Sequence, residues 1–203
     1  MEAKHSLERE TAHRVDCFST VSDVTAHECE ELMDKKCHAV LPNGFEADFV
    51  PKAAEFKRKR KAARELILRM ANCLTGCEFP EDTLIVGTSG RYEFRNKGID
   101  VFIEAMNRLG RDRNLNKQVL ALVEVPAWVG EPREDLVERL SSNDKFDTPL
   151  ECPVITHWLN DMSHDNVTGM MKYHDMWNRP EDKVKLIFVP CYLDGKDGVI
   201  NIS

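Results

Sequence analysis

Two basic side chains, Arg91 and Lys97, stand six positions apart in a loop that begins at Gly90. An arginine can bind phosphate oxygens through two parallel hydrogen bonds, and a lysine adds a compact positive charge. This pair therefore suits a doubly negative ligand such as a phosphate or a diphosphate. On the residues alone, the alternative is a surface loop in which both side chains are simply solvated.

The segments on either side of this loop favour an anion-binding site over a solvated surface loop. Residues 84–86 are apolar and β-prone, which predicts a short buried strand of a parallel sheet. Residues 99–109 carry apolar side chains at helical spacing, at Phe102, Ile103, Met106 and Leu109. We expect the amino-terminal end of this helix to offer unpaired N–H groups and the positive end of its dipole to an anion.

The remaining chain alternates in the same way between strand and helix patterns. Further strands are expected at residues 17–21, 39–41, 118–125, 154–157 and 184–189. Further helices are expected at residues 4–15, 22–35, 52–76, 133–140 and 165–177. Strands separated by helices imply right-handed βαβ crossovers, so the predicted fold class is α/β with parallel strands.

Composition narrows the classes of function. The chain has 203 residues and a formal net charge of −7, which argues against general nucleic-acid binding. Its apolar runs are too short to cross a bilayer, so no membrane partner is expected. Seven cysteines without a pairing rhythm predict reduced thiols and a cytoplasmic protein. Cys73 and Cys77 lack a matching second pair, so no metal site is expected.

The residues around the basic loop resemble a sequence motif of a known family. Residues 90–100 read Gly-Arg-Tyr-Glu-Phe-Arg-Asn-Lys-Gly-Ile-Asp, and residues 102–105 read Phe-Ile-Glu-Ala. This run closely resembles the signature of glycogen synthases of the animal, fungal and Bacteroidetes-like type, which are retaining glycosyltransferases of the GT-B fold. The resemblance implies that Gly90, Arg91 and Lys97 hold the diphosphate of the sugar donor, with Arg91 and Lys97 as catalytic residues.

The resemblance also implies an activity. Such an enzyme transfers glucose from UDP-glucose or ADP-glucose to the non-reducing end of an α-1,4-glucan, with retention and without a metal or cofactor. The resemblance leaves open which of the two donors is used and whether the protein forms a homo-oligomer. The competing hypothesis is a short, non-catalytic Rossmann-like module that binds a phosphorylated ligand or a protein partner.

The amino-terminal part of the chain resembles the family in a second place. A Glu-Arg pair at residues 8 and 9, a strand end and the turn Pro42-Asn43-Gly44 resemble the close of the family's N-terminal Rossmann-like domain. Arg9 would then reach the donor phosphates. Without the resemblance, Arg9 is a helix-surface charge paired with Glu8 or Glu10.

The resemblance runs from about residue 4 to residue 195 and implies three parts. Residues 1–48 would end the N-terminal domain, residues 49–80 would connect, and residues 81–203 would form the first half of the nucleotide-sugar-binding domain. The family's glycine-containing loop and its downstream pair of glutamates have no counterpart here. The chain then corresponds to the middle of such an enzyme, and we expect it to be inactive alone.

Two further features have competing interpretations. His157 follows an Ile-Thr pair at an expected strand end, where it would be either a residue of the ligand cleft or a structural histidine bonded nearby. The basic run at residues 57–61, with Arg64, would be either a docking surface for a glucan, a nucleic acid or a protein, or a solvated helix face. We favour the solvated face, because lysine and arginine are good helix formers and no aromatic residue interrupts the run.

Overall fold

The computed structural model describes residues 2–193 and 198–200. The chain divides into two compact units, Met1–Lys52 and Ala53–Ser203, and each is described here by itself. No helix of the described residues is long and apolar enough to cross a membrane.

The first unit consists of short elements. They are the helices α1 (Glu2–Arg14) and α2 (Asp23–Met33), the strands β1 (Ser19–Thr20) and β2 (Ala39–Val40), and a 3₁₀ helix at Ala47–Phe49. The two strands pair in parallel. Ser22 caps α2, since its hydroxyl oxygen accepts a 3.1 Å hydrogen bond from the Thr25 N–H. The predicted order of helix, strand, helix and strand is confirmed.

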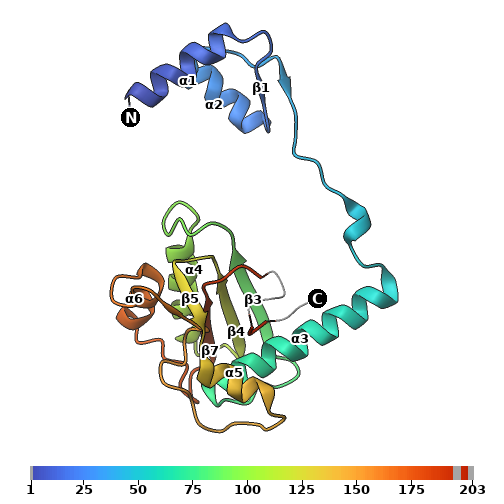
Figure 1. Cartoon of the computed structure of the whole chain (residues 1–203), viewed down its shortest axis with the longest axis vertical. Coiled ribbons are helices and arrows are strands. Elements are labelled where there is room, and N and C mark those ends of the chain that lie inside the picture. Colours follow the sequence, from blue (N-terminus) through green and yellow to red (C-terminus); the bar gives the residue numbers. More distant parts are fainter. Residues whose placement is uncertain (1, 194–197, 201–203) are drawn as a thin grey trace. The chain divides into compact units, whose positions relative to one another are not determined.

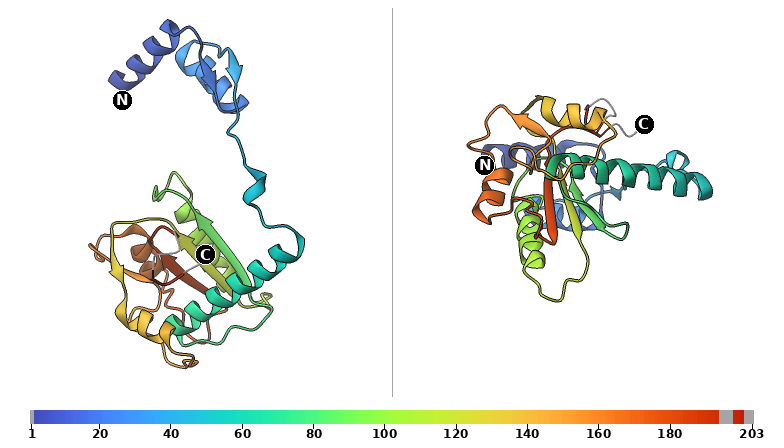
Figure 2. Two further views of the ribbon diagram at one scale, coloured as in Figure 1. Left: turned by 45° about the vertical axis from the view of Figure 1, so that its right-hand side comes forward. Right: turned by 90° about the horizontal axis from the view of Figure 1, so that it is seen from below.

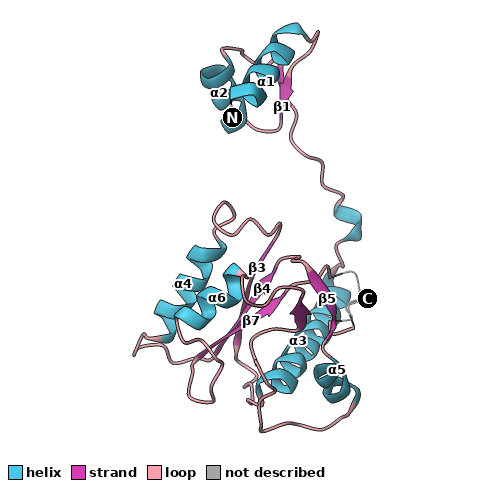
Figure 3. Ribbon diagram, turned by 60° about the vertical axis from the view of Figure 1, so that its left-hand side comes forward, coloured by secondary structure: helices cyan, strands magenta, loops and turns pink. Residues whose placement is uncertain are grey.

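The second unit is built on a three-stranded parallel sheet with the order β3-β4-β7 (Figures 1 and 3). Its strands are β3 (Leu84–Ser89), β4 (Val119–Glu124) and β7 (Val184–Val189). The side chains of β7 are buried throughout, and those of β4 up to its last residue. Runs of apolar residues without polar alternation form such doubly covered strands, so the predicted parallel α/β architecture is confirmed. The strand β3 lies at the edge and is only partly buried.

Helices cover both faces of this sheet, as Figure 2 also shows. Leu120 and Leu122 of β4 belong to one apolar core, with α3 (Ala53–Thr75) and α5 (Glu134–Ser141). Ala121 and Val123 belong to a second core, with α4 (Ile99–Gly110) and α6 (Asn166–Tyr173). Alternate residues of one strand therefore fill two different cores, which defines a three-layer α/β/α arrangement. The helix α3, expected within a connecting segment, lies in this second unit.

Three departures from the predicted elements lie in the carboxyl-terminal half of the second unit. Residues 154–157 divide: Ile155 forms a parallel bridge with Phe188 of β7, whereas His157 belongs to β6 (His157–Leu159). The strand β6 pairs in antiparallel fashion with β5 (Val129–Pro132), which was not expected. The helix predicted to reach residue 177 ends at Tyr173, and Asp175 and Asn178 have φ of 58° and 56°, a conformation that cannot continue a helix.

Candidate functional site

A pocket of about 430 Å³ opens at the carboxyl end of the parallel sheet. All three strands contribute to it through their last residues or the residues that follow them. Its lining comprises Ser89, Gly90, Arg91, Tyr92, Glu124, Pro126, Cys191, Tyr192 and Leu193. Ligands of open α/β sheets bind at this edge, and the volume falls within the range of small-molecule sites.

Gly90 and Arg91 enter the pocket directly from the end of β3. Gly90 has φ of 143°, and nothing lies within 4 Å of the position that a Cβ would occupy there. The Arg91 side chain is 78% exposed, and its Nε lies 3.2 Å from the Glu93 carboxylate. Within the part of the chain that the structure describes, the two Nη groups of Arg91 have no hydrogen-bond partner. They can therefore bind oxygen atoms of a ligand in the pocket.

Tyr92 holds this loop against α6. Its hydroxyl donates a hydrogen bond to the Asp165 carboxylate and accepts one of 3.2 Å from the Val167 N–H. Its ring meets the Phe188 ring edge-on, with 6.0 Å between the centroids. Burial, and then the hydrogen bond to Asp165, raise the pKa of Tyr92 far above its ordinary value. The neutral phenol thus anchors the loop directly after Arg91.

The amino-terminal end of α4 does not offer the free N–H groups that the sequence predicted. The Ile99 and Asp100 N–H groups donate to the Phe94 carbonyl, at 3.0 and 3.3 Å. The Val101 N–H donates to the Asp100 carboxylate at 2.9 Å. This expectation is wrong because the preceding turn folds back over the helix end. Binding of an anion here depends on side chains instead.

Lys97 lies in the same loop, next to the helix, and is exposed. It is not among the residues that line the pocket at the sheet edge. Among residues 2–193 and 198–200, its ammonium group has no hydrogen-bond or ion-pair partner. Its assignment to the diphosphate remains a prediction.

The other two predicted site residues lie elsewhere. Arg9 is on α1 of the first unit, where its Nη2 lies 3.4 Å from the Asp34 carboxylate. The expected pairing with Glu8 or Glu10 is wrong, because those carboxylates pair with Lys4 and Arg14. His157 is 2% exposed, and its Nδ1 lies 3.0 Å from the Thr156 hydroxyl. It does not line the pocket, so its role in a ligand cleft stays a prediction.

Glu124 is a charged pocket residue that the sequence did not predict. It is the last residue of β4 and stands opposite Ser89 in the register of the sheet. The carboxyl is half-buried, and this burial raises its pKa. The signal was present in the sequence, because a single acidic residue ends an otherwise apolar strand before Pro126.

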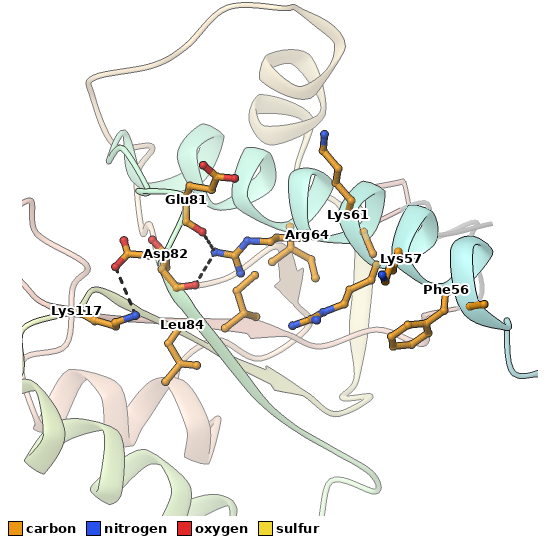
Figure 4. Close-up of a pocket in the computed structure, with 14 residues that line it drawn as sticks. Phe56, Lys57, Lys61, Arg64, Glu81, Asp82, Leu84 and Lys117 are labelled. Carbon is orange, nitrogen blue, oxygen red and sulfur yellow. Dashed lines mark hydrogen bonds and ion pairs between the residues drawn. The ribbon is translucent and has the colours of Figure 1, made fainter.

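A second pocket, of about 980 Å³, lies between α3 and the exposed edge of β3 (Figure 4). Lys57, Lys61 and Arg64 of the basic run line it. Arg64 is held by structural bonds, since its Nη2 donates to the Glu81 and Thr83 carbonyls at 2.6 Å each. Residues 57–61 are all exposed, as the favoured solvated face requires, although part of the run also borders this hollow.

The described residues contain no group of three or more His, Cys, Asp or Glu side chains that could hold a metal ion. Cys73 and Cys77 of the second unit are buried free thiols. The side chains at the sheet edge that can take part in chemistry are those of an arginine, a glutamate, a cysteine, a serine and two tyrosines.

The fold is that of an α/β protein with parallel strands, consistent with the Rossmann-like class, and it has a pocket at the carboxyl ends of those strands. A sequence profile of the glycogen synthase family matches residues 2–143. The chain belongs to the glycogen synthase family.

Named relatives support this assignment. A glycogen [starch] synthase of Neurospora crassa is 26% identical over 98% of this chain and 36% of its own length. Isoform 2 of the Saccharomyces cerevisiae enzyme is 27% identical over 98% of this chain and 37% of its own. The liver enzyme of Mus musculus is 31% identical over 59% of this chain and 18% of its own. The chain thus spans about a third of the length of the fungal relatives.

Proposed function

We propose that this chain supplies the diphosphate-binding part of a retaining glucosyltransferase of the GT-B fold. The reaction moves glucose from a nucleoside-diphosphate-glucose, UDP-glucose or ADP-glucose, to the non-reducing end of an α-1,4-glucan. The observation that carries the proposal is Arg91 in a pocket at the carboxyl end of the sheet, with its Nη groups directed to no described residue. Family membership disfavours the alternative of a non-catalytic module.

Electrostatic stabilisation is the role proposed for the basic residues. The bond between the anomeric carbon and the β-phosphate breaks, so negative charge grows on the departing diphosphate while the carbon becomes cation-like. A guanidinium placed at those oxygens before the reaction stabilises this charge more than it stabilises the bound donor. Arg91 takes this role in the proposal, with Lys97 and Arg9 as further cations and with no metal or cofactor required.

The finer placement of the chain belongs to the same proposal. Residues 1–48 would complete an N-terminal Rossmann-like domain, residues 49–80 would connect, and residues 81–203 would begin the donor-binding domain. The expected partners are the nucleotide-sugar and the glucan, and the expected compartment is the cytoplasm. Self-association into a homo-oligomer is compatible with the partly exposed edge strand β3.

Titration of the 203-residue chain with inorganic pyrophosphate and with UDP, followed by amide NMR shifts, tests the proposal. Both ligands should shift amides of residues 89–92 and 124–125, and Arg91→Ala should weaken both dissociation constants by about tenfold or more. Lys97→Ala should weaken them similarly. Arg95→Ala is the matched control, since Arg95 is exposed in the same loop and does not line the pocket and, unlike Lys97, is not assigned to the diphosphate by the family motif. Equal binding by wild type and Arg91→Ala would refute the proposed function.

A further inference from the structure

Glu124 occupies the centre of the carboxyl edge of the sheet. It ends the middle strand, with Ser89 of β3 opposite on one side and Val189 of β7 on the other. Adjacent strands lie about 4.8 Å apart, and Arg91 follows Ser89 by only two residues. Glu124 and Arg91 line the same pocket. A ligand on the guanidinium therefore lies within reach of this carboxyl group.

The carboxyl group of Glu124 has no partner among the residues described in the structure. Other half-buried acidic side chains of this unit are engaged. Asp135 binds both Arg133 Nε and Nη2, at 3.0 and 2.6 Å, and Asp165 binds the Tyr92 hydroxyl and the Thr168 N–H. Partial desolvation of a carboxyl group that none of these residues bonds is unfavourable for stability, so the described residues give Glu124 no structural role.

The charge of Glu124 determines what it can bind. An ionised carboxylate only accepts hydrogen bonds, and it repels phosphate oxygens. The part of the ligand that faces Glu124 must therefore present hydrogen-bond donors, while the phosphates face Arg91. Sugar hydroxyl groups are neutral donors that a nucleoside diphosphate carries next to its phosphates.

The order of elements points to the sugar of the nucleoside. In dinucleotide-binding α/β folds, the turn after the first strand binds the diphosphate, and an acidic residue beyond the following helix accepts hydrogen bonds from the ribose. The same order occurs here: β3, the Arg91 loop, α4, then β4 ending in Glu124. We propose that Glu124 accepts hydrogen bonds from the ribose hydroxyl groups of the nucleoside diphosphate whose phosphates Arg91 binds. This inference rests on the proposed function and makes Glu124 a determinant of specificity for ribonucleotides.

The test compares ligands with and without ribose hydroxyls, on the whole 203-residue chain. NMR titrations with pyrophosphate, UDP, UDP-glucose and 2′,3′-dideoxy-UDP are run on wild type, Glu124→Ala and Glu124→Gln. Glu124→Ala should weaken UDP and UDP-glucose by roughly 10- to 30-fold, with a smaller loss for Glu124→Gln, which keeps one acceptor oxygen. Pyrophosphate should bind within about twofold of wild type, because the phosphate contacts remain. Dideoxy-UDP should bind wild type and both variants equally weakly.

The results that would refute the role of Glu124 differ from the result that would refute the proposed function. Glu131→Gln removes an exposed carboxylate of the same unit and should change nothing. Unchanged UDP binding in Glu124→Ala, an equal loss of pyrophosphate binding, or a loss confined to UDP-glucose would overturn the ribose assignment. Each variant's amide spectrum is compared with that of wild type, so unfolding is not mistaken for lost binding. Failure of Arg91→Ala to weaken pyrophosphate would instead refute the proposed function.

Discussion

At the scale of single residues, the phenol of Tyr92 couples the pocket to the core. Its hydroxyl serves the Asp165 carboxylate and the Val167 N–H at once, and both groups lie at the start of α6. The backbone at the adjacent Arg91 is thereby held in place, although the Arg91 side chain is exposed. A charge that is positioned before the ligand arrives needs less reorganisation on binding.

Tyr92→Phe should lower the free energy of unfolding by about 1–3 kcal/mol, because the Val167 N–H loses its bond to the hydroxyl and the Asp165 carboxylate keeps only its bonds to Thr168. Urea unfolding of the chain measures this loss. Tyr173→Phe is the matched control: its hydroxyl makes no bond to a described residue and the side chain is 84% exposed, so a change within about 0.5 kcal/mol is expected. Equal stability of Tyr92→Phe and wild type would show that the hydroxyl is not an anchor.

The sequence predicted part of the site for physical reasons that the structure makes clear. Gly90 and Arg91 could be found because residue type and position after a strand both point to an anion. Glu124 was missed because a charged residue at a strand end is usually a solvated terminus, and its burial depends on β3 and β7. The occupied N–H groups of α4 were not predictable, since the turn at Phe94 that captures them has no signature in hydrophobic periodicity.

At the scale of elements, α3 is joined to the loop before β6 by close backbone packing. The helix is followed by Gly76, with φ of 65°, and a Cβ at that position would lie 2.4 Å from the Thr148 carbonyl carbon. The Asn72 side chain fixes the same loop by donating to the Phe146 carbonyl at 2.9 Å. If this loop moved away from α3, the hydrogen bond between Asn72 and Phe146 would break.

Gly76→Ala should therefore destabilise the chain by about 3 kcal/mol or more, since a left-handed conformation and a backbone collision add together. Gly98→Ala separates the two effects: Gly98 has the same φ of 65° but nothing within 4 Å of its Cβ position. It should lower stability by only about 1–2 kcal/mol. Urea unfolding of both variants measures these two losses. A similar loss of stability in Gly76→Ala and Gly98→Ala would show that Thr148 moves aside without cost.

Most elements could be predicted from apolar patterning, because β4 and β7 are continuous apolar runs and the helices carry apolar residues at helical spacing. The strand β5 could not, since Gly130 and Pro132 favour a turn and pairing with β6 alone fixes it. The early end of the last helix likewise depends on tertiary bonds: Asn178 donates to the Pro153 and Leu186 carbonyls, at 2.8 Å each.

At the scale of the whole molecule, the chain holds a ligand pocket on a sheet with one open side. The edge strand β3 leaves Leu84 51% exposed, beside the hollow that α3 overhangs. The fungal relatives are almost three times as long as the part that this chain matches. In the proposed GT-B arrangement, the glucose and the glucan would be positioned by segments that those relatives carry in addition.

We therefore expect the 203-residue chain to bind the donor weakly and to transfer no glucose. Two charge-assisted contacts contribute about 1.5–3 kcal/mol each, and association costs at least about 4 kcal/mol, which leaves a dissociation constant of tens of millimolar at best for the phosphates alone. The proposed ribose contacts of Glu124 would bring a nucleoside diphosphate only to about the millimolar range. In the proposed arrangement, the residues that position glucose belong to parts of the relatives that this chain does not match, so binding should not lead to reaction. Incubation with labelled UDP-glucose or ADP-glucose and glycogen, beside a heat-inactivated sample, measures the transfer. Incorporation above that background that disappears in Arg91→Ala would show that this chain alone completes the active site, and the proposed division of labour would then be wrong.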